Sequence, residues 1–128
     1  MILSFDEVGE ILDELAERIP EPFFEELNGG VLLLPEAYPD PENGDDMFIL
    51  GEYCVDEMGR YINLYYGSFV KLFADEPREV WEEELFITLR HEFTHHVEAL
   101  AGDRSLDYKD AAYLMEYQEE LEETEYDH

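Results

Sequence analysis

Three of the four histidines lie within six residues, in the stretch LRHEFTHHVEALAGD that begins at Leu89. His91, Glu92 and His95 form the pattern His-Glu-x-x-His. On an α-helix each residue advances about 100°, so His91 and His95 differ by about 40° and one turn in height. Their ring nitrogens can therefore meet one cation, and Glu92, about 60° from His95, is close enough to hold a water on that cation.

Metal-assisted hydrolysis needs this division of labour between side chains. Two neutral imidazoles and a third ligand hold Zn²⁺, and a fourth position stays open for water. The ion lowers the pKa of that water to about 7, and a nearby carboxylate takes its proton. The sequence therefore predicts Zn²⁺ as the cofactor, His91 and His95 as metal ligands, and Glu92 as the general base.

The third metal ligand is less clearly indicated. Three ligands on one straight helix lie nearly in line and cannot surround an ion tetrahedrally, so the third is expected after a turn or from another element. Gly102 is predicted to supply that turn, and Asp103, which follows it, is the first candidate. Glu116, further along the chain, is an alternative, and Glu98 is either a group that orients His95 or a solvated glutamate.

Hydrophobic periodicity predicts the elements that position these residues. The helical spacing of apolar residues predicts a helix over Ser4–Arg18, which Ser4 and Glu7 begin as a capping box. Predicted after it are a short helix over Pro22–Leu27, strands over Val31–Leu34, Met47–Val55 and Arg60–Tyr66, and a short helix over Ser68–Ala74. Gly51, inside the second strand, indicates a bulge or a close approach of another element.

The histidines fall on a long predicted helix that begins near Pro77 and ends at Gly102. Its apolar residues lie on more than one face, which is typical of a helix at the centre of a fold. A last helix is predicted from Asp107, and a small sheet between helices indicates the α+β class.

Composition limits the classes of partner. A chain of 128 residues corresponds to one domain, over residues 1–128, with a hydrophobic core. Cys54 is the single cysteine, and we find no signal sequence and no apolar run that could span a bilayer, so we expect a soluble, cytoplasmic protein. The net charge of −28 argues against nucleic acids and anionic membranes as partners, and it favours cations, basic peptides or simply solubility.

The doubled histidine of HEFTHHVEALAGD and the segments RIPEPF, VLLLPEAYP, ILGEY and INLYYGSF occur in a characteristic order. In these segments the chain resembles the small single-domain bacterial zincin-like metallopeptidases, or minimal zincins. The resemblance implies a three-stranded sheet with flanking N- and C-terminal helices, and zinc on the HExxH helix. It assigns His91 and His95 as ligands and Glu92 as base, whereas Glu98 stands where the family commonly has glycine.

The resemblance also suggests roles for further residues near the expected zinc ion. His96 matches the second histidine of the family and, about 100° from His95, is expected to be structural. Tyr65, Tyr66, Tyr108 and Tyr113 are candidate donors to an oxyanion. By analogy with zincins, Tyr61–Tyr66 is the candidate edge strand for an extended peptide.

We therefore expect a zinc-dependent metallopeptidase that hydrolyses peptide bonds of a peptide or protein substrate, with a metal-bound water and Glu92 as general base. Two alternatives stay open. One is a zincin-like domain in which the metal braces the fold without catalysis. The other is an acidic protein that binds a basic partner, which the charge alone favours.

Overall fold

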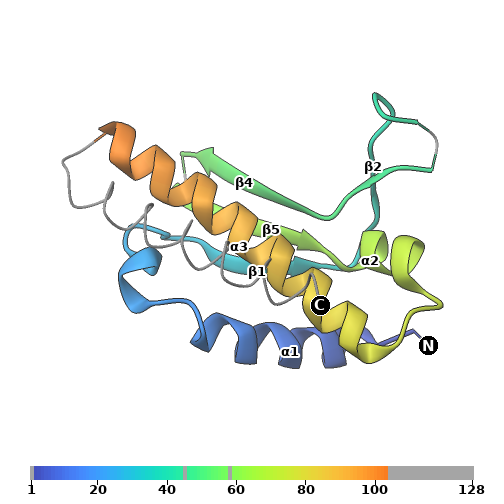
Figure 1. Ribbon diagram of the computed structural model, residues 1–128. Coiled ribbons are helices and arrows are strands. Elements are labelled where there is room, and N and C mark those ends of the chain that lie inside the picture. Colours follow the sequence, from blue (N-terminus) through green and yellow to red (C-terminus); the bar gives the residue numbers. More distant parts are fainter. Residues whose placement is uncertain (1, 45, 58, 104–128) are drawn as a thin grey trace, which may run out of the picture.

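The computed structural model describes residues 2–44, 46–57 and 59–103 (Figure 1). In chain order the elements are α1 (Phe5–Glu17), the 3₁₀ helix η1 (Glu21–Phe24), β1 (Gly30–Leu34), β2 (Tyr38–Pro39), β3 (Phe48–Ile49), β4 (Gly51–Asp56), β5 (Gly59–Tyr65), α2 (Tyr66–Phe73) and α3 (Arg78–Asp103). Helices flank a small mixed sheet, so the α+β class is confirmed. The helix predicted from Asp107 lies outside the described residues.

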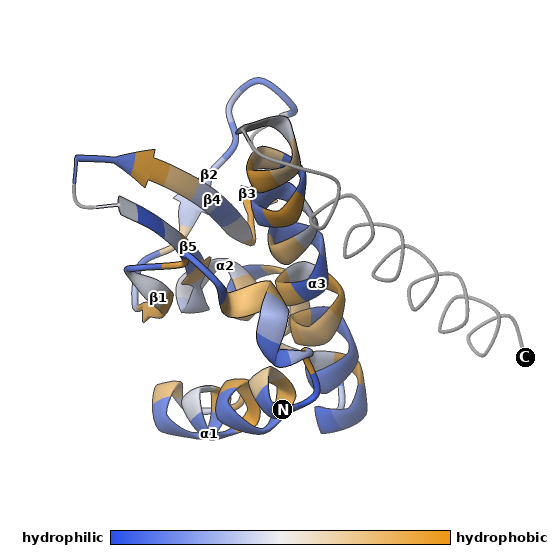
Figure 2. Cartoon of the chain, turned by 90° about the vertical axis from the view of Figure 1, so that its left-hand side faces the viewer, coloured by the Kyte–Doolittle hydropathy of each residue, from blue (hydrophilic) through white to orange (hydrophobic). Residues whose placement is uncertain are grey.

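The N-terminal helix α1 begins where the capping box predicts. The backbone N–H of Glu7 donates to Ser4 Oγ at 3.1 Å, and the backbone N–H of Ser4 donates to Glu7 Oε1, also at 3.1 Å. Two donors that a helix end leaves without partners are thereby satisfied. The hydropathy colours of Figure 2 show both hydrophobic and hydrophilic residues around this helix. Its buried face consists of Val8, Ile11, Leu12 and Leu15.

The three-stranded sheet has the order β1-β5-β4, with β1 parallel to β5 and β4 antiparallel to β5. The predicted strand Met47–Val55 is divided at Leu50, because β3 pairs with β2 whereas β4 pairs with β5. The prediction of Tyr61–Tyr66 as an edge strand was wrong. Its residues form most of the central strand β5, and their aromatic and β-branched composition suits a strand paired on both sides.

Gly51 begins β4 and lies where the sheet meets α3. A Cβ atom at this position would lie 2.7 Å from Leu64 Cδ2 and 2.8 Å from Thr88 Cγ2, closer than real side chains come. The close approach predicted for Gly51 is thus confirmed, and the missing side chain lets α3 pack directly on β4.

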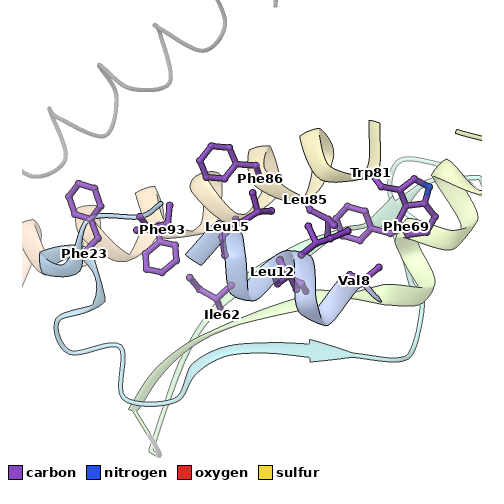
Figure 3. Close-up of a cluster of buried hydrophobic side chains, with 14 of the residues drawn as sticks. Val8, Leu12, Leu15, Phe23, Ile62, Phe69, Trp81, Leu85, Phe86 and Phe93 are labelled. Atoms are coloured by element: carbon purple, nitrogen blue, oxygen red, sulfur yellow. The ribbon is translucent and has the colours of Figure 1, made fainter. Parts of the chain in front are cut away.

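The long helix α3 is central, as its all-round apolar composition predicts. It contacts β4, β5, α1, α2 and η1. Apolar side chains recur along its buried side, namely those of Trp81, Leu85, Leu89, Phe93, Val97 and Leu100. Figure 3 shows Trp81, Leu85 and Phe93 within the buried cluster. Burying this row against its neighbours is the main force that places the helix.

The end predicted for this helix at Gly102 was wrong, because α3 continues through Gly102 and Asp103. Glycine costs a helix only about 1 kcal/mol relative to alanine, so it permits a stop without enforcing one. Within the part of the chain that the structure describes, no helix is both long enough and apolar enough to cross a membrane.

Candidate functional site

His91 and His95 lie one turn apart on the exposed side of α3, and their rings meet. The two Nε2 atoms are 3.1 Å apart, and the ring planes are nearly perpendicular, at 84°. The helix thus brings together the two nitrogens that the sequence predicts as metal ligands, at a surface that solvent reaches.

This spacing can be compared with what one zinc ion requires. Zn–N bonds are roughly 2.0–2.1 Å long, so two imidazole nitrogens at the tetrahedral angle of about 109° stand about 3.3 Å apart. Nitrogens 3.1 Å apart correspond to an angle of about 98° at such an ion. The separation of the two nitrogens is therefore close to the separation that a single zinc ion requires.

No group of three His, Cys, Asp or Glu side chains among residues 2–44, 46–57 and 59–103 converges as a metal site. Asp103 was predicted to follow a turn at Gly102, but it continues α3 and lies about 12 Å along the helix axis beyond His95. Glu116 lies outside the described residues. Glu98 is exposed and lines the same cleft as the two histidines.

Glu92 is buried beside the two histidines, with 6% of its surface exposed. Burial raises the pKa of this carboxyl above its ordinary value, and the nearby Glu52 raises it further. His95 and the backbone N–H of Tyr53 oppose that rise in the pKa. A carboxylate with a raised pKa accepts a proton more readily, which suits the role of general base.

An open cleft of about 670 Å³ surrounds these groups. It lies between α3 and β4, which run beside each other in Figure 1, and its lining residues are Gly51, Tyr53, His91, Glu92, His95, Glu98 and Ala99. Strand β4 therefore forms one wall of the cleft, and the HExxH turn of α3 forms the other.

His96 points the other way and is fully buried. Its Nε2 lies 2.7 Å from the carbonyl oxygen of Glu25, and its Nδ1 lies 2.7 Å from the hydroxyl oxygen of Tyr53. A carbonyl only accepts, so Nε2 carries the proton and the Tyr53 hydroxyl donates to Nδ1. Burial lowers the pKa of His96, which keeps this neutral form.

His96 thus ties α3 to β4 and to the end of η1, in agreement with the structural role expected for it. Sequence reasoning missed its partner Tyr53, which also lines the cleft. The signal was available in principle, because Tyr53 follows Gly51 by two residues and so faces the same side of β4.

The tyrosines proposed as oxyanion donors are placed elsewhere or not described. The Tyr65 hydroxyl donates to Glu52 Oε1 at 2.8 Å, and the Tyr66 hydroxyl donates to the carbonyl oxygen of Leu3 at 2.6 Å. Neither tyrosine lines the cleft at the histidines. Tyr108 and Tyr113 lie outside the described residues.

Comparison with known proteins gives a match to a solved structure. No family model matches the chain, and no curated protein matches it. A solved structure described as a conserved hypothetical protein from "Thermo thermophilus" superimposes with a TM-score of 0.71 at 35% sequence identity, over 79% of this chain and 100% of that one. The chain belongs to the same family as this conserved hypothetical protein.

Proposed function

We propose that the protein is a zinc-dependent peptidase of the minimal zincin type. The observation that carries the proposal is the HExxH turn of α3, whose two histidine nitrogens are 3.1 Å apart with the buried Glu92 beside them in an open cleft. Two converging imidazoles and a carboxylate with a raised pKa are what metal-assisted hydrolysis uses.

Each of these residues has a distinct task. Zinc, when bound, polarises a carbonyl oxygen and makes water acidic enough to attack near neutral pH. His91 and His95 would hold the ion through the nitrogens that face each other, and Glu92 would take a proton from the attacking water and return it to the leaving amine. The third protein ligand stays a prediction, with Glu98 at the cleft and Glu116 outside the described residues as the remaining candidates.

The edge strand β4 is suited to hold an extended substrate. The Tyr65 N–H donates to the carbonyl oxygen of Leu50, and hydrogen-bonded positions alternate along an antiparallel pair. The backbone groups of Gly51 and Val55 consequently point away from β5, toward the open edge. A peptide added at this edge would lie across the cleft, as the resemblance to zincins implies.

The charge of the chain favours basic substrates. The chain carries 35 acidic and 7 basic residues, and none of the residues lining the cleft is lysine or arginine. The electrostatic field of a surface that carries mostly one sign of charge raises the local concentration of oppositely charged ligands and their association rate. We therefore expect peptides with lysine or arginine to be cleaved faster than acidic peptides.

The experiment is a measurement of bound zinc and of peptide cleavage on the full chain. We expect about one zinc per chain, lost in a His91→Ala, His95→Ala double variant. Cleavage of a peptide library should disappear with chelator and return with zinc. The Glu92→Gln variant should bind zinc but cleave nothing. Zinc bound in stoichiometric amount without turnover of any peptide would refute the peptidase proposal.

A metal-braced domain without catalytic activity is the second candidate. Thermal unfolding distinguishes the two candidates. If the metal braces the fold, a chelator should lower the free energy of unfolding by several kcal/mol, because metal binding then contributes to folding. A catalytic ion on an independently stable core should change activity far more than stability.

A further inference from the structure

The three-stranded sheet has two different faces, because side chains alternate between the faces along each strand. One face belongs to the hydrophobic core, to which α1, α2 and α3 all contribute side chains, and Figure 2 shows α1 and α3 on one side of the strands. The opposite face, which we call the outer face, is formed by residues of all three strands. They are Leu32 of β1, Tyr61, Asn63 and Tyr65 of β5, and Glu52, Cys54 and Asp56 of β4.

Exposed apolar and aromatic side chains lie on the outer face. Leu32, in the middle of β1, is 43% exposed. Tyr38 of β2 packs edge-on against Tyr65, with ring centroids 5.0 Å apart, and 39% of its surface is exposed. Exposed apolar surface beside tyrosine rings is typical of a protein–protein contact, in which tyrosine is enriched.

Two carboxylates of the outer face are held in place by tyrosine hydroxyls. Tyr65 donates to Glu52 Oε1 at 2.8 Å, and Tyr61 donates to Asp56 Oδ2 at 2.9 Å. The bond to Asp56 raises the pKa of Tyr61 to about 12, so the Tyr61 hydroxyl stays a donor at neutral pH. A carboxylate has about four acceptor sites, so Glu52 can accept further hydrogen bonds. The strand residues of the outer face include no lysine or arginine.

Asn63 gives an independent indication that the outer face lacks a hydrogen-bond donor. It lies between Leu32 and Glu52 in the register of the three strands and is only 9% exposed. Among the described residues its Oδ1 atom accepts no hydrogen bond, and its Nδ2 atom makes a long contact of 3.8 Å to Cys54 Sγ. Buried polar atoms normally have a partner, so this oxygen favours an occupant that carries N–H groups.

We propose that the outer face binds a segment of another protein that presents an arginine beside an apolar side chain. A guanidinium group has five N–H donors, which can bond the Glu52 carboxylate and the Asn63 amide oxygen together, and its plane stacks on tyrosine rings. The apolar neighbour of the arginine would cover Leu32. The net charge of −28 repels nucleic acids and opposes the docking of a second copy of the chain at this face.

The outer face is separate from the candidate active site. None of its strand residues lines the cleft at His91 and His95. Binding at the outer face therefore does not depend on the proposed peptidase function, and it can be measured on the metal-free chain.

The test measures the Kd of a short fluorescent peptide for the full chain in chelator and low salt. The peptide carries two Arg-Leu pairs among glycine and serine residues, and its control has citrulline, which is uncharged, in place of arginine. We expect the arginine peptide to bind about 10-fold more tightly than the citrulline peptide, because hydrogen bonds to a charged group are the stronger ones.

Variants of the chain locate the binding. Glu52→Gln removes one charge but keeps an acceptor for Tyr65, and it should weaken binding of the arginine peptide about 10-fold. Glu10→Gln removes the same charge from an exposed position of α1 and should change the Kd by less than about twofold. Leu32→Ser should weaken binding severalfold, whereas Val55→Ser, an exposed position that alternates to the other face of the sheet, should not.

A ¹H–¹⁵N spectrum recorded during the titration shows where the peptide binds, and its changes should centre on β1, β4 and β5. Changes centred on His91, His95 and Glu98 would place the peptide in the cleft and overturn the proposal. The absence of binding, equal binding of the arginine and citrulline peptides, or equal effects of Glu52→Gln and Glu10→Gln would also overturn it. Self-association of the free chain that Leu32→Ser abolishes would assign the outer face to a second copy instead.

Discussion

The hydrogen bond between Tyr53 and His96 should contribute measurably to stability, and the Tyr53→Phe variant tests it. The substitution removes only the hydroxyl group, which donates to His96 Nδ1 at 2.7 Å. His96 is fully buried and its other nitrogen is held by the carbonyl oxygen of Glu25, so water cannot readily replace the lost donor. A buried polar atom left without a partner costs about 1–3 kcal/mol.

The corresponding change in melting temperature can be worked from the length of the chain. Unfolding entropy near 60 °C is about 2.1 cal/mol/K per residue, or about 0.27 kcal/mol/K for a chain of this size. A loss of 1–3 kcal/mol then lowers Tm by about 4 to 11 °C. Urea unfolding, followed by the fluorescence of the single tryptophan Trp81, should give a loss in the same range.

Tyr61→Phe provides a matched control, since the Tyr61 hydroxyl donates to Asp56 Oδ2 at 2.9 Å in an exposed position. Water can replace that contact, so the free energy of unfolding should change by less than about 0.5 kcal/mol. If Tyr53→Phe changes stability no more than Tyr61→Phe, the assigned network is wrong. A long-range ¹H–¹⁵N spectrum gives an independent check, because the proton of His96 must be on Nε2 and not on Nδ1.

Further predictions concern the same elements. Burial raises the pKa of Glu92 above its ordinary value of 4.5, so its charge destabilises the metal-free fold at neutral pH. Glu92→Gln should therefore raise the free energy of unfolding at pH 7, and this gain should vanish below about pH 4.5, where the side chain is protonated in both states; urea unfolding at the two pH values checks the sign. Gly51→Ala should lower stability by about 1–3 kcal/mol and weaken zinc binding, because its methyl group would push Thr88 and the following HExxH turn away from β4; unchanged unfolding and zinc affinity would contradict that account. Ser4→Ala should cost about 0.5–2 kcal/mol through the lost capping box, as measured by thermal unfolding. Cleavage of a lysine-rich peptide should slow as salt rises from about 0.05 to about 0.5 M, since salt screens surface charge; a rate independent of salt would show that the acidic surface does not attract substrate.

The amino-acid sequence by itself determined the features that depend on neighbours along the chain. His91, Glu92 and His95 lie within about one helical turn, so helical periodicity alone brings them together. The capping box of α1 and the β composition of the strands are likewise local signals, and they predicted α1, β1 and β5 to within a residue or two. Gly51 indicated a close approach of another element, although the sequence did not show which element this would be.

Only the tertiary structure decided which distant residues share the site. The choice of β4 over β5 as the edge strand and the bond from Tyr53 to His96 both depend on contacts between residues far apart in sequence. The continuation of α3 through Gly102 was also beyond local signals, because glycine favours a helix end only weakly. The periodicity of apolar residues indicates which face of a helix or strand is buried, but it does not indicate which other element covers that face. The packing of the whole core determines that pairing.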